Sequence, residues 1–359
     1  MSGGWAQNEP KKAPAKGEAA DNIDWQKAQQ LFRRNQQGEK LSPEEDAYLK
    51  RALAARKAKG PAGGRGANQR KAPERLIPLS DMSASDRYEG QDGGLYGGGR
   101  NTPPDGHRKA AEAELAKIRP LNAEGKPADD GTIGFVAISM SNATMEFSRF
   151  KQQADRSPLK SGKVTIVDCA QGGQAMAQWA PPEARPWQVA RERLAAAKVS
   201  PQQVQVAWIK LANVAPSGSM AEHNGKVESD TVAVLHNAKA LFPNLRVAYL
   251  GSRIYGGNAV GALNPEPYAY EGAFAVRSLI QRQIKGDAEL ALTKSPLLLW
   301  GPYLWAEGTK GRKSDQLVWE RSDFTDDGVH PTNSGRDKVA ELMLKFFTTD
   351  PLAKGWFGK

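Results

Sequence analysis

The chain has 359 residues, of which 39% are hydrophobic and 25% are charged, and its formal net charge is +10. This length fits one sizeable α/β domain with an appendage, or two small domains, and the apolar content excludes general disorder. The single cysteine, Cys169, excludes an internal disulfide framework and a zinc site built from cysteines. We expect neither a metal centre nor a cofactor, because four histidines without metal-binding spacing are present: His107, His223, His236 and His330.

The positive charge is concentrated in the first 75 residues, which hold 16 Lys/Arg and 9 Asp/Glu and so carry +7 of the +10. The basic residues are interleaved with acids, and no stripe of aromatic and basic residues accompanies them. A solvated helical surface is the favoured interpretation, and we expect no nucleic-acid partner. The alternative is that this basic segment binds nucleic acid or an acidic protein.

No run of eighteen apolar residues occurs, so we expect no membrane span. The first ten residues, MSGGWAQNEP, lack the basic-then-apolar pattern of a signal peptide. A secreted or periplasmic location is one hypothesis, with a new methionine placed on a mature export product, and a cytoplasmic location is the other. The sequence predicts no oligomeric state.

The chain is predicted to comprise a disordered segment, a helical hairpin, a flexible linker and a main domain, at residues 1–22, 23–58, 59–75 and 76–359. The second helix of the hairpin begins with a capping box, with Ser42 as N-cap, Pro43 at the first helical position and Glu45 completing it. The linker is rich in Gly, Ala and basic residues.

Residues 76–107 form an unusual glycine-rich segment, which contains the run GGLYGGGRNTPP at 93–104. They lack the Gly-Lys-Ser/Thr of a phosphate-binding loop, and no strand precedes them as a dinucleotide-binding fingerprint requires. Two interpretations have equal weight. The segment is either a structural Ω-type wrap or one wall of an active site.

From residue 131 onward, short apolar runs alternate with helical patterns. Strands are predicted at 133–139, 164–169, 204–211, 246–252 and 296–301, and helices at about 143–155, 187–198, 228–241, 270–285 and 334–347. The nearly continuous apolar runs are typical of strands covered on both faces. The sequence therefore predicts an α/β fold, with a doubly wound parallel five-stranded sheet in a three-layer α/β/α arrangement. Ligands of such sheets bind at the carboxyl ends of the strands.

Polar residues follow the first three predicted strands. Ser141 lies where the first strand turns into a helix, a position that projects a hydroxyl toward the ligand edge but that also suits a simple N-cap. Gly172 and Gly173 follow the second strand and Asn213 the third. These glycines and this asparagine could supply hydrogen bonds to a ligand, although each is also common in ordinary turns.

The most specific pattern is Asp327-x-x-His330, just ahead of the last amphipathic helix. In a loop turn this spacing lets the carboxylate bond one imidazole nitrogen and leaves the other nitrogen facing the site. Such an arrangement fixes the imidazole tautomer and stabilises the imidazolium that forms when a nucleophile loses its proton.

Together these segments resemble the SGNH (GDSL-like) hydrolase superfamily over roughly residues 131–350, and within it a divergent, mainly bacterial group. The resemblance implies that Ser141 is the nucleophile, with Asp327 and His330 as its catalytic partners. It also implies an oxyanion hole made of the Ser141 and Gly173 backbone N–H groups and the Asn213 side chain, with Gly172 as a close alternative to Gly173. The first block departs from G-D-S-L by reading S-M-S-N, and the third reads L-A-N-V in place of G-x-N-D.

Aromatic and charged residues near the ends of the fourth and fifth strands suggest how a substrate is bound. We expect substrate binding by Arg253, Tyr255, Trp300 and Tyr303, with Trp305, Lys210 and Glu266 as weaker candidates. Aromatic faces with charged donors suit sugar rings.

The predicted function is a serine esterase that removes O-acyl groups, especially acetyl, from carbohydrate through an acyl-enzyme. The alternative is a non-catalytic carbohydrate-binding or scaffolding protein on the same fold. The acyl group and the alcohol of the substrate are not predicted.

Overall fold

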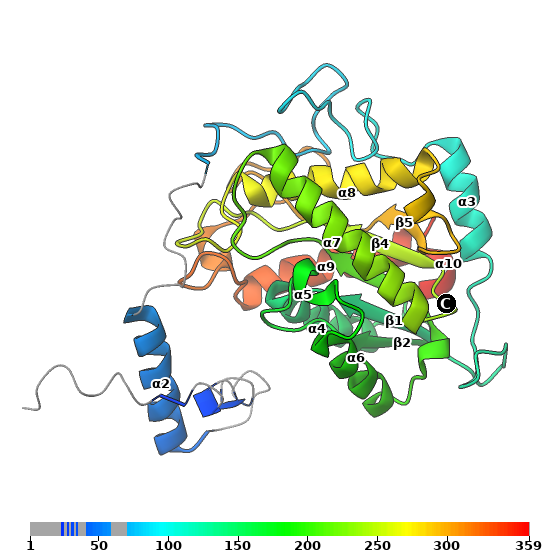
Figure 1. Ribbon diagram of the computed structural model, residues 1–359, viewed down its shortest axis with the longest axis horizontal. Coiled ribbons are helices and arrows are strands. Elements are labelled where there is room, and N and C mark those ends of the chain that lie inside the picture. Colours follow the sequence, from blue (N-terminus) through cyan, green and yellow to red (C-terminus); the bar gives the residue numbers. More distant parts are fainter. Residues whose placement is uncertain are drawn as a thin grey trace, which may run out of the picture. The chain divides into compact units, whose positions relative to one another are not determined.

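The computed structural model describes residues 23–24, 27–28, 30–31, 34, 41–58 and 70–358 (Figure 1). The chain divides into two compact units, Met1–Gly64 and Arg65–Lys359. The predicted disordered segment 1–22 and residues 59–69 of the predicted linker lie outside the described residues.

The N-terminal unit contains helix α2, Pro43–Ala58. Its capping box has the expected form, because the Glu45 amide donates to Ser42 Oγ at 3.2 Å and the Ser42 amide donates to Glu45 Oε2 at 2.9 Å. Described positions between 27 and 34 are helical. Among the described residues of this unit, the buried side chains are Ala28, Leu31, Leu49 and Ala52.

The larger unit is built on five parallel strands in the order β2-β1-β3-β4-β5. Their bounds are β1 Ile133–Ile138, β2 Val164–Asp168, β3 Val204–Lys210, β4 Val247–Gly251 and β5 Leu297–Trp300. Val136 pairs with Val167 on one side and Ala207 on the other, so β1 is an interior strand. The predicted α/β class and parallel doubly wound sheet are confirmed, and the strand order is the flavodoxin-like one.

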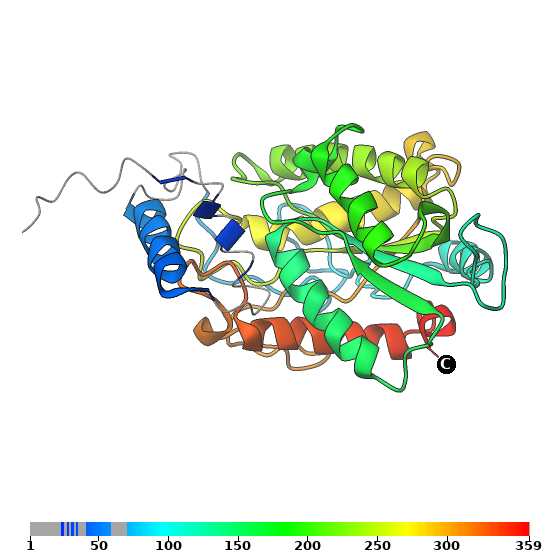
Figure 2. The same ribbon diagram turned by 90° about the horizontal axis from the view of Figure 1, so that it is seen from below.

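Helices cover both faces of this sheet (Figure 2). One face packs against α3 Asp105–Leu115, α4 Ser141–Arg156, α9 Asn333–Thr349 and α10 Lys354–Phe357. The other packs against α5 Met176–Trp179, α6 Arg185–Ala196, α7 Met220–Leu241 and α8 Tyr268–Ile284. Three short 3-10 helices lie in the connections, at Pro201–Gln203, Ala288–Leu290 and Arg321–Asp323.

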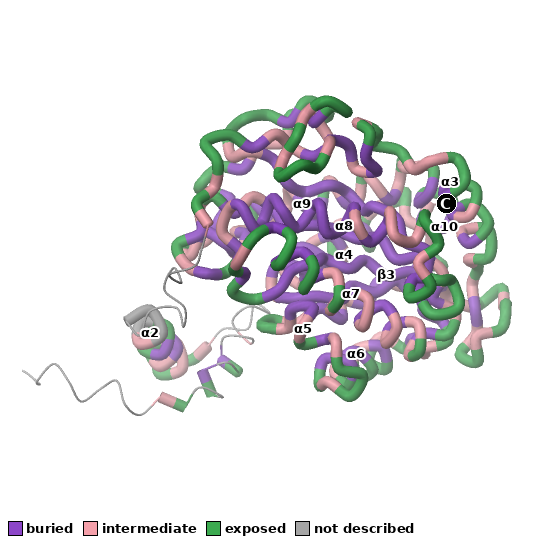
Figure 3. Tube along the Cα trace, turned by 45° about the horizontal axis from the view of Figure 1, so that its top comes forward, coloured by how far each residue is buried: buried purple, intermediate pink, exposed green. Residues whose placement is uncertain are grey.

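Alternation along the strands explains the two cores. Phe135 and Ala137 face the α4/α9 side, whereas Val136 and Ile138 face the α6/α7/α8 side. Every residue of β3 is buried, as Figure 3 shows. Strands with apolar residues at successive positions are therefore sandwiched between helices, as the sequence predicts.

Among the predicted helices, α7 departs furthest from its predicted limits. Helix α7 begins at Met220, eight residues before the predicted start at 228, because Ser219 and Glu222 form a second capping box. Helix α3 was absent from the prediction. Among the described residues, no helix has the length and apolarity needed to cross a bilayer.

The glycine-rich segment is held against α8 and the end of β5. Arg277 Nη1 donates to the Asp92 carbonyl at 2.7 Å, and Trp300 Nε1 donates to the Leu95 carbonyl at 2.6 Å. The Tyr270 hydroxyl donates to the Ile77 carbonyl at 2.8 Å. These bonds favour the interpretation of the segment as a structural wrap.

Candidate active site

Ser141 and His330 meet at the carboxyl edge of the sheet. Ser141 is the first residue of α4, two residues after buried Ser139 and directly after the N-cap residue Met140. His330 lies in the turn that precedes α9. Ser141 Oγ is 2.7 Å from His330 Nε2, although 189 residues separate them. This is hydrogen-bond distance, the geometry in which an imidazole can take the hydroxyl proton.

Asp327 holds the other side of the imidazole. Its Oδ2 is 2.5 Å from His330 Nδ1, and its Oδ1 accepts from the amides of Val329 at 2.9 Å and His330 at 3.0 Å. The Thr325 hydroxyl adds a fourth bond at 2.8 Å. Burial would raise the pKa of Asp327, but the bonds and charge of His330 and the backbone amides hold it well below its ordinary value. The carboxylate therefore stays ionised and can stabilise an imidazolium.

The Asp-x-x-His turn is closed by backbone bonds and by a neighbouring loop. The Thr325 amide donates to the His330 carbonyl at 2.8 Å, and the Val260 amide donates to the Asp327 carbonyl at 3.0 Å. Gly328 has φ +68°, and a Cβ there would lie 1.6 Å from the Asn258 carbonyl oxygen. Only glycine allows the loop after β4 to pack this closely on the turn.

Several backbone N–H groups near Ser141 have no backbone partner in the described part of the chain, and those of Ser141, Gly172 and Gly173 are among them. Gly173 has φ +77°, and a Cβ on Gly172 would lie 4.0 Å from Ser141 Cβ. Both glycines are exposed. The turn after β2 thus brings free donors beside the candidate nucleophile, with Gly172 as close a candidate as Gly173.

Asn213 follows β3 and is held in place from several sides. Its Oδ1 accepts from the Ala177 amide at 2.9 Å, its Nδ2 donates to Asp230 Oδ2 at 2.5 Å, and its carbonyl accepts from Asn264 Nδ2 at 2.8 Å. The side-chain amide has two hydrogens. One is used by Asp230, which leaves the other for a ligand.

A buried ion pair supports the nucleophile helix from beneath. Lys210 Nζ, at the end of β3, is 2.5 and 2.7 Å from the two carboxylate oxygens of Glu146 on α4. Both side chains are fully buried. Burial lowers the pKa of Lys210 to about 8, while the Glu146 carboxylate opposes the shift. Lys210, a weaker candidate for substrate binding, is therefore committed to Glu146.

The predicted substrate-binding residues fall into two groups. Arg253 and Tyr255 follow β4, Arg253 being only 4% exposed and Tyr255 half-buried. Trp300 and Tyr303 are buried beneath the glycine-rich segment, where the Tyr303 hydroxyl accepts from the Leu79 amide at 3.1 Å and Trp300 holds the Leu95 carbonyl. Trp300 and Tyr303 hold that segment in place, which leaves them out of the candidate site.

The weaker candidates Trp305 and Glu266 bind each other. Trp305 Nε1 donates to Glu266 Oε1 at 2.8 Å, and the Gly256 and Tyr270 amides also donate to this carboxyl group. Burial raises the pKa of Glu266 to about 7, although these donors oppose the rise. The pair anchors the loop between β4 and α8 and does not contact the triad.

Three polar residues near the triad are absent from the sequence prediction: Asn142, Glu146 and Asp230. Asn142 directly follows the nucleophile, and Glu146 lies on the same helix five residues after Ser141. A polar residue on a buried helix face is a usable signal for Glu146, because it implies a partner. Asp230 lies midway along α7, where the sequence offers no comparable signal.

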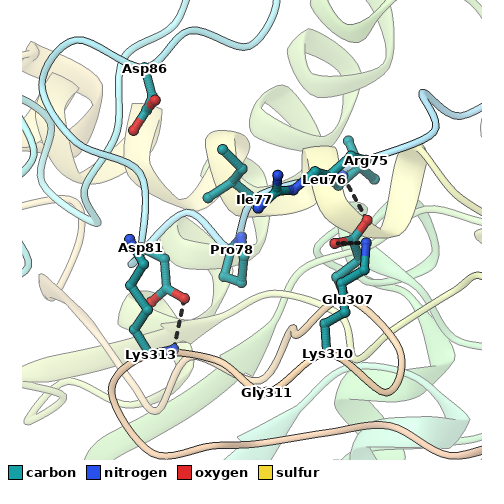
Figure 4. Close-up of a pocket in the computed structure, with 10 residues that line it drawn as sticks. All are labelled: Arg75, Leu76, Ile77, Pro78, Asp81, Asp86, Glu307, Lys310, Gly311 and Lys313. Carbon is teal, nitrogen blue, oxygen red and sulfur yellow. Dashed lines mark hydrogen bonds and ion pairs between the residues drawn. The ribbon is translucent and has the colours of Figure 1, made fainter.

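A cavity of about 250 Å³ has none of the triad residues in its lining. Figure 4 shows the residues that line it. It is lined by residues 75–78, Asp81 and Asp86 on one side, and by Glu307, Lys310, Gly311 and Lys313 on the other. The Lys313 amide donates to Asp81 Oδ2 at 2.8 Å, and the Leu76 amide donates to Glu307 Oε1 at 2.9 Å. Among its charged side chains, Lys310 and Glu307 form an ion pair of 3.1 Å. Within the described ranges, no group of three or more His, Cys, Asp or Glu side chains could hold a metal ion.

Comparisons with known proteins yield distant structural likenesses. No protein-family model matches the chain, and no curated protein matches it. A protein of Bacteroides fragilis named as an acylhydrolase is 15% identical, with 68% of this chain and 97% of that chain covered at a TM-score of 0.32. A GDSL-like lipase of Bacteroides thetaiotaomicron is 15% identical, with 67% and 95% covered at a TM-score of 0.27.

The periplasmic domain of a lipopolysaccharide acetyltransferase from Salmonella ser. Paratyphi A is 12% identical, with 68% of this chain and 97% of that chain covered at a TM-score of 0.34. At such identities and TM-scores, the chemistry of this chain has to be argued from its own residues.

Proposed function

We propose that the chain is a serine hydrolase of the SGNH (GDSL-like) type that cleaves carboxylic esters through an acyl-enzyme. One observation carries the proposal: an unbroken hydrogen-bond chain runs from Ser141 Oγ through the His330 ring to Asp327, with distances of 2.7 and 2.5 Å. A helix-capping serine has no need of an imidazole whose second nitrogen is bound by an ionised carboxylate.

In the acylation step, His330 Nε2 takes the proton of Ser141 as Oγ forms a bond to the ester carbonyl carbon. The carbonyl electron pair moves to oxygen and gives a tetrahedral oxyanion. When the intermediate collapses, the bond to the alcohol oxygen breaks, and His330 donates its proton to that oxygen. The alcohol leaves, and the acyl group stays on Ser141.

In the deacylation step, a water molecule takes the place of the alcohol. His330 accepts a proton from this water as its oxygen attacks the acyl carbon. When the second tetrahedral intermediate collapses, the bond from the acyl carbon to Ser141 Oγ breaks, and His330 donates the proton to Oγ. The carboxylic acid is released and the free enzyme is restored. Asp327 keeps the imidazole oriented in both steps and remains ionised.

The oxyanion is assigned to the free donors beside Ser141. These are the Ser141 amide, the amide of Gly173 or Gly172, and the second hydrogen of Asn213 Nδ2. Donors of this kind act on charge that develops only in the intermediate, and each contributes roughly 2.7–4 kcal/mol of barrier lowering. The bonds that fix Asn213 support this role, because a preorganised donor needs no reorientation during the reaction.

The finer proposal concerns the substrate, an O-acyl group, especially acetyl, on carbohydrate. Two residues support it: Tyr255 and Arg253 follow β4 at the carboxyl edge of the sheet, where an aromatic face and a guanidinium suit a sugar. A screen of acetylated polysaccharides beside short and long p-nitrophenyl esters tests it. Preference for long acyl chains over acetyl would contradict it.

The central test compares Ser141→Ala with Ser148→Ala. Ser148 lies on the same helix but donates to Asp168 at 2.7 Å, so it serves as a matched control outside the triad. We expect Ser141→Ala to abolish p-nitrophenyl acetate turnover and fluorophosphonate labelling, while Ser148→Ala keeps both. Equal activity of Ser141→Ala and the unaltered protein would overturn the assignment. Absence of turnover and labelling in the unaltered protein would favour the non-catalytic binding alternative.

A further inference from the structure

Three arginine side chains are buried in the described part of the chain, and they differ in what surrounds them. Arg253, Arg277 and Arg312 are 4%, 2% and 4% exposed. A buried guanidinium is stable only when its donors and its charge are matched, because it loses its hydration on burial. The partners of each arginine therefore indicate whether the protein itself satisfies the side chain or leaves donors for a ligand.

Arg277 and Arg312 are fully matched. Arg277 binds Asp92 through an ion pair of 3.1 Å and donates to the Gly94 carbonyl and to Gln91. Arg312 binds both carboxylate oxygens of Asp315, at 2.9 and 2.5 Å, and donates to two backbone carbonyls. Each has a carboxylate partner and satisfied donors, and each holds a loop in place.

Arg253 has no such partner. Among the described residues, its side chain has one hydrogen bond, from Nη1 to Met140 Sδ at 3.5 Å, and its buried Nε has no partner. No carboxylate of the described residues lies within ion-pair distance. The acidic groups whose charges act on it are Glu146, Asp327 and Glu266, and each is bound elsewhere: to Lys210, to His330, and to Trp305 with two backbone amides.

The position of this unmatched charge is informative. Arg253 is two residues beyond the end of β4, and its contact Met140 directly precedes Ser141. The adjacent Lys210–Glu146 pair has no net charge, so it does not neutralise the positive charge of Arg253. A positively charged group with an unpartnered donor thus lies against the residue that directly precedes the candidate nucleophile.

We propose that Arg253 recognises a carboxylate on the ester substrate, close to the ester bond that Ser141 attacks. This inference rests on the proposed hydrolase function and names the substrate class as anionic esters. A planar guanidinium binds a carboxylate through paired N–H donors, and the bond strengthens where water is excluded. The carboxylate has two possible sources: the acyl half, as in a dicarboxylic half-ester, or the alcohol half, as in an acylated uronic acid.

Two matched pairs of esters distinguish these sources. For the alcohol half, 4-acetoxybenzoate is compared with 4-acetoxybenzamide, which has similar size and no charge. For the acyl half, 4-nitrophenyl hydrogen glutarate is compared with its terminal amide. Rates for Ser141→Ala are subtracted in every case, because the half-ester also hydrolyses without enzyme.

For the unaltered protein, we expect kcat/KM for the carboxylated member of one pair to exceed that of the amide by about tenfold or more, mainly through KM. Arg253→Met should remove this ratio, and Arg253→Lys should keep part of it because the charge remains. Equal kcat/KM for both members of both pairs would overturn the proposal. The proposal would also be overturned if Arg253→Met lowered kcat/KM equally for the charged and the neutral esters.

Arg277→Met is the matched control. Losing a satisfied ion pair should lower the thermal unfolding temperature of that variant and leave the charge ratio unchanged. Arg253→Met should unfold at or above the temperature of the unaltered protein, since it removes an unpaired charge. If Arg253→Met fails to fold, the proposal is still tested by the ratio of kcat/KM between the carboxylated ester and its amide, measured in the unaltered protein and in Arg253→Lys.

The two proposals fail differently. Turnover of neutral esters without any preference for charge overturns only the role of Arg253. Absence of turnover of every ester, together with absence of fluorophosphonate labelling, overturns the hydrolase function and the substrate class with it.

Discussion

The side chain of Asn142 donates to the backbone carbonyl of Val329 at 2.8 Å, across 187 residues of sequence. Asn142 follows the candidate nucleophile on α4, and Val329 precedes the candidate base in the turn before α9. Asn142 and Val329 are both buried. One hydrogen bond therefore joins the element that carries Ser141 to the element that carries His330.

Asn142→Ala should lower kcat by about tenfold with little change in KM, because the Ser141–His330 geometry loosens while substrate contacts remain. Steady-state kinetics with p-nitrophenyl acetate measures this split. Asn237→Ala is the control, since Asn237 makes a similar 2.8 Å bond to the Ala180 carbonyl far from the triad. A larger loss of kcat in the control would contradict the positioning role of Asn142.

Asp327→Asn should lower kcat by roughly 10³–10⁴-fold, because an amide neither fixes the productive imidazole tautomer nor stabilises the imidazolium. Single-turnover and steady-state rates measure the loss. Asp337→Asn removes the ion pair with Arg149 near the surface and should change kcat by less than about twofold. Retention of most activity in Asp327→Asn would argue against a triad.

Gly328→Ala should impair both folding and activity. The added Cβ would meet the Asn258 carbonyl at 1.6 Å, so the loop after β4 has to move off the catalytic turn. We expect a loss of about 2–3 kcal/mol of unfolding free energy. Gly286→Ala shares a positive φ, +82°, but meets no atom within 4 Å, so it should cost only about 1 kcal/mol. Urea unfolding compares the two, and equal losses would contradict the packing argument.

The buried Glu266 carboxyl group should make the folded protein less stable as the pH rises. Burial raises its pKa from 4.5 to about 7, so the folded state binds its proton more tightly than the unfolded state does. Its contribution is fully present below pH 4.5 and is lost as pH rises through about 7. Glu266→Gln should remove a decline on the order of 2 kcal/mol across this window.

Thermal unfolding of the unaltered protein and of Glu266→Gln between pH 4.5 and 7.5 measures how their stabilities differ with pH. Asp168, whose pKa burial raises to about 6, contributes a decline of the same sign in both proteins, so only the difference between them reports on Glu266. Parallel stability curves would contradict the assignment.

The Lys210–Glu146 pair should behave as a buried unit. Lys210→Met leaves the Glu146 carboxylate buried without its partner and should cost about 3–5 kcal/mol of unfolding free energy. Lys210→Met combined with Glu146→Leu should cost clearly less, because neither charge then remains. Denaturant unfolding of both variants measures the coupling. Additive losses would show that the two side chains do not interact as the distances indicate.

The two strongest sequence patterns depend on local contacts. The apolar runs predicted all five strands to within one residue at each end, because a parallel strand buried on both faces has few alternatives. The Asp327–His330 bond spans three residues, so the turn that makes it forms within one short segment. The boundary of α7 was missed for a local reason too, since the capping box at Ser219 extends the helix beyond its apolar pattern.

Contacts between distant segments decided the rest of the candidate site. Trp300 and Tyr303 follow a strand at the ligand edge, as a substrate-binding aromatic would, yet the glycine-rich segment covers both. Nothing in the local pattern of residues 297–305 predicts that a segment 200 residues earlier packs there. The same holds for Asp230, which reaches Asn213 only because α7 crosses beside β3.

By itself, the sequence determined the parallel α/β architecture, the N-terminal capping box and the Asp-x-x-His turn, because each follows from the periodicity or spacing of neighbouring residues. Only the tertiary structure brings Ser141 Oγ to His330 Nε2, since the two residues are 189 positions apart. It also separated Arg253, which lacks an ion-pair partner among the described residues, from Arg277 and Arg312, which have one. The physical reason is that hydrogen bonding and desolvation depend on which groups lie next to one another in the fold. The packing of the whole sheet against its helices determines those neighbours.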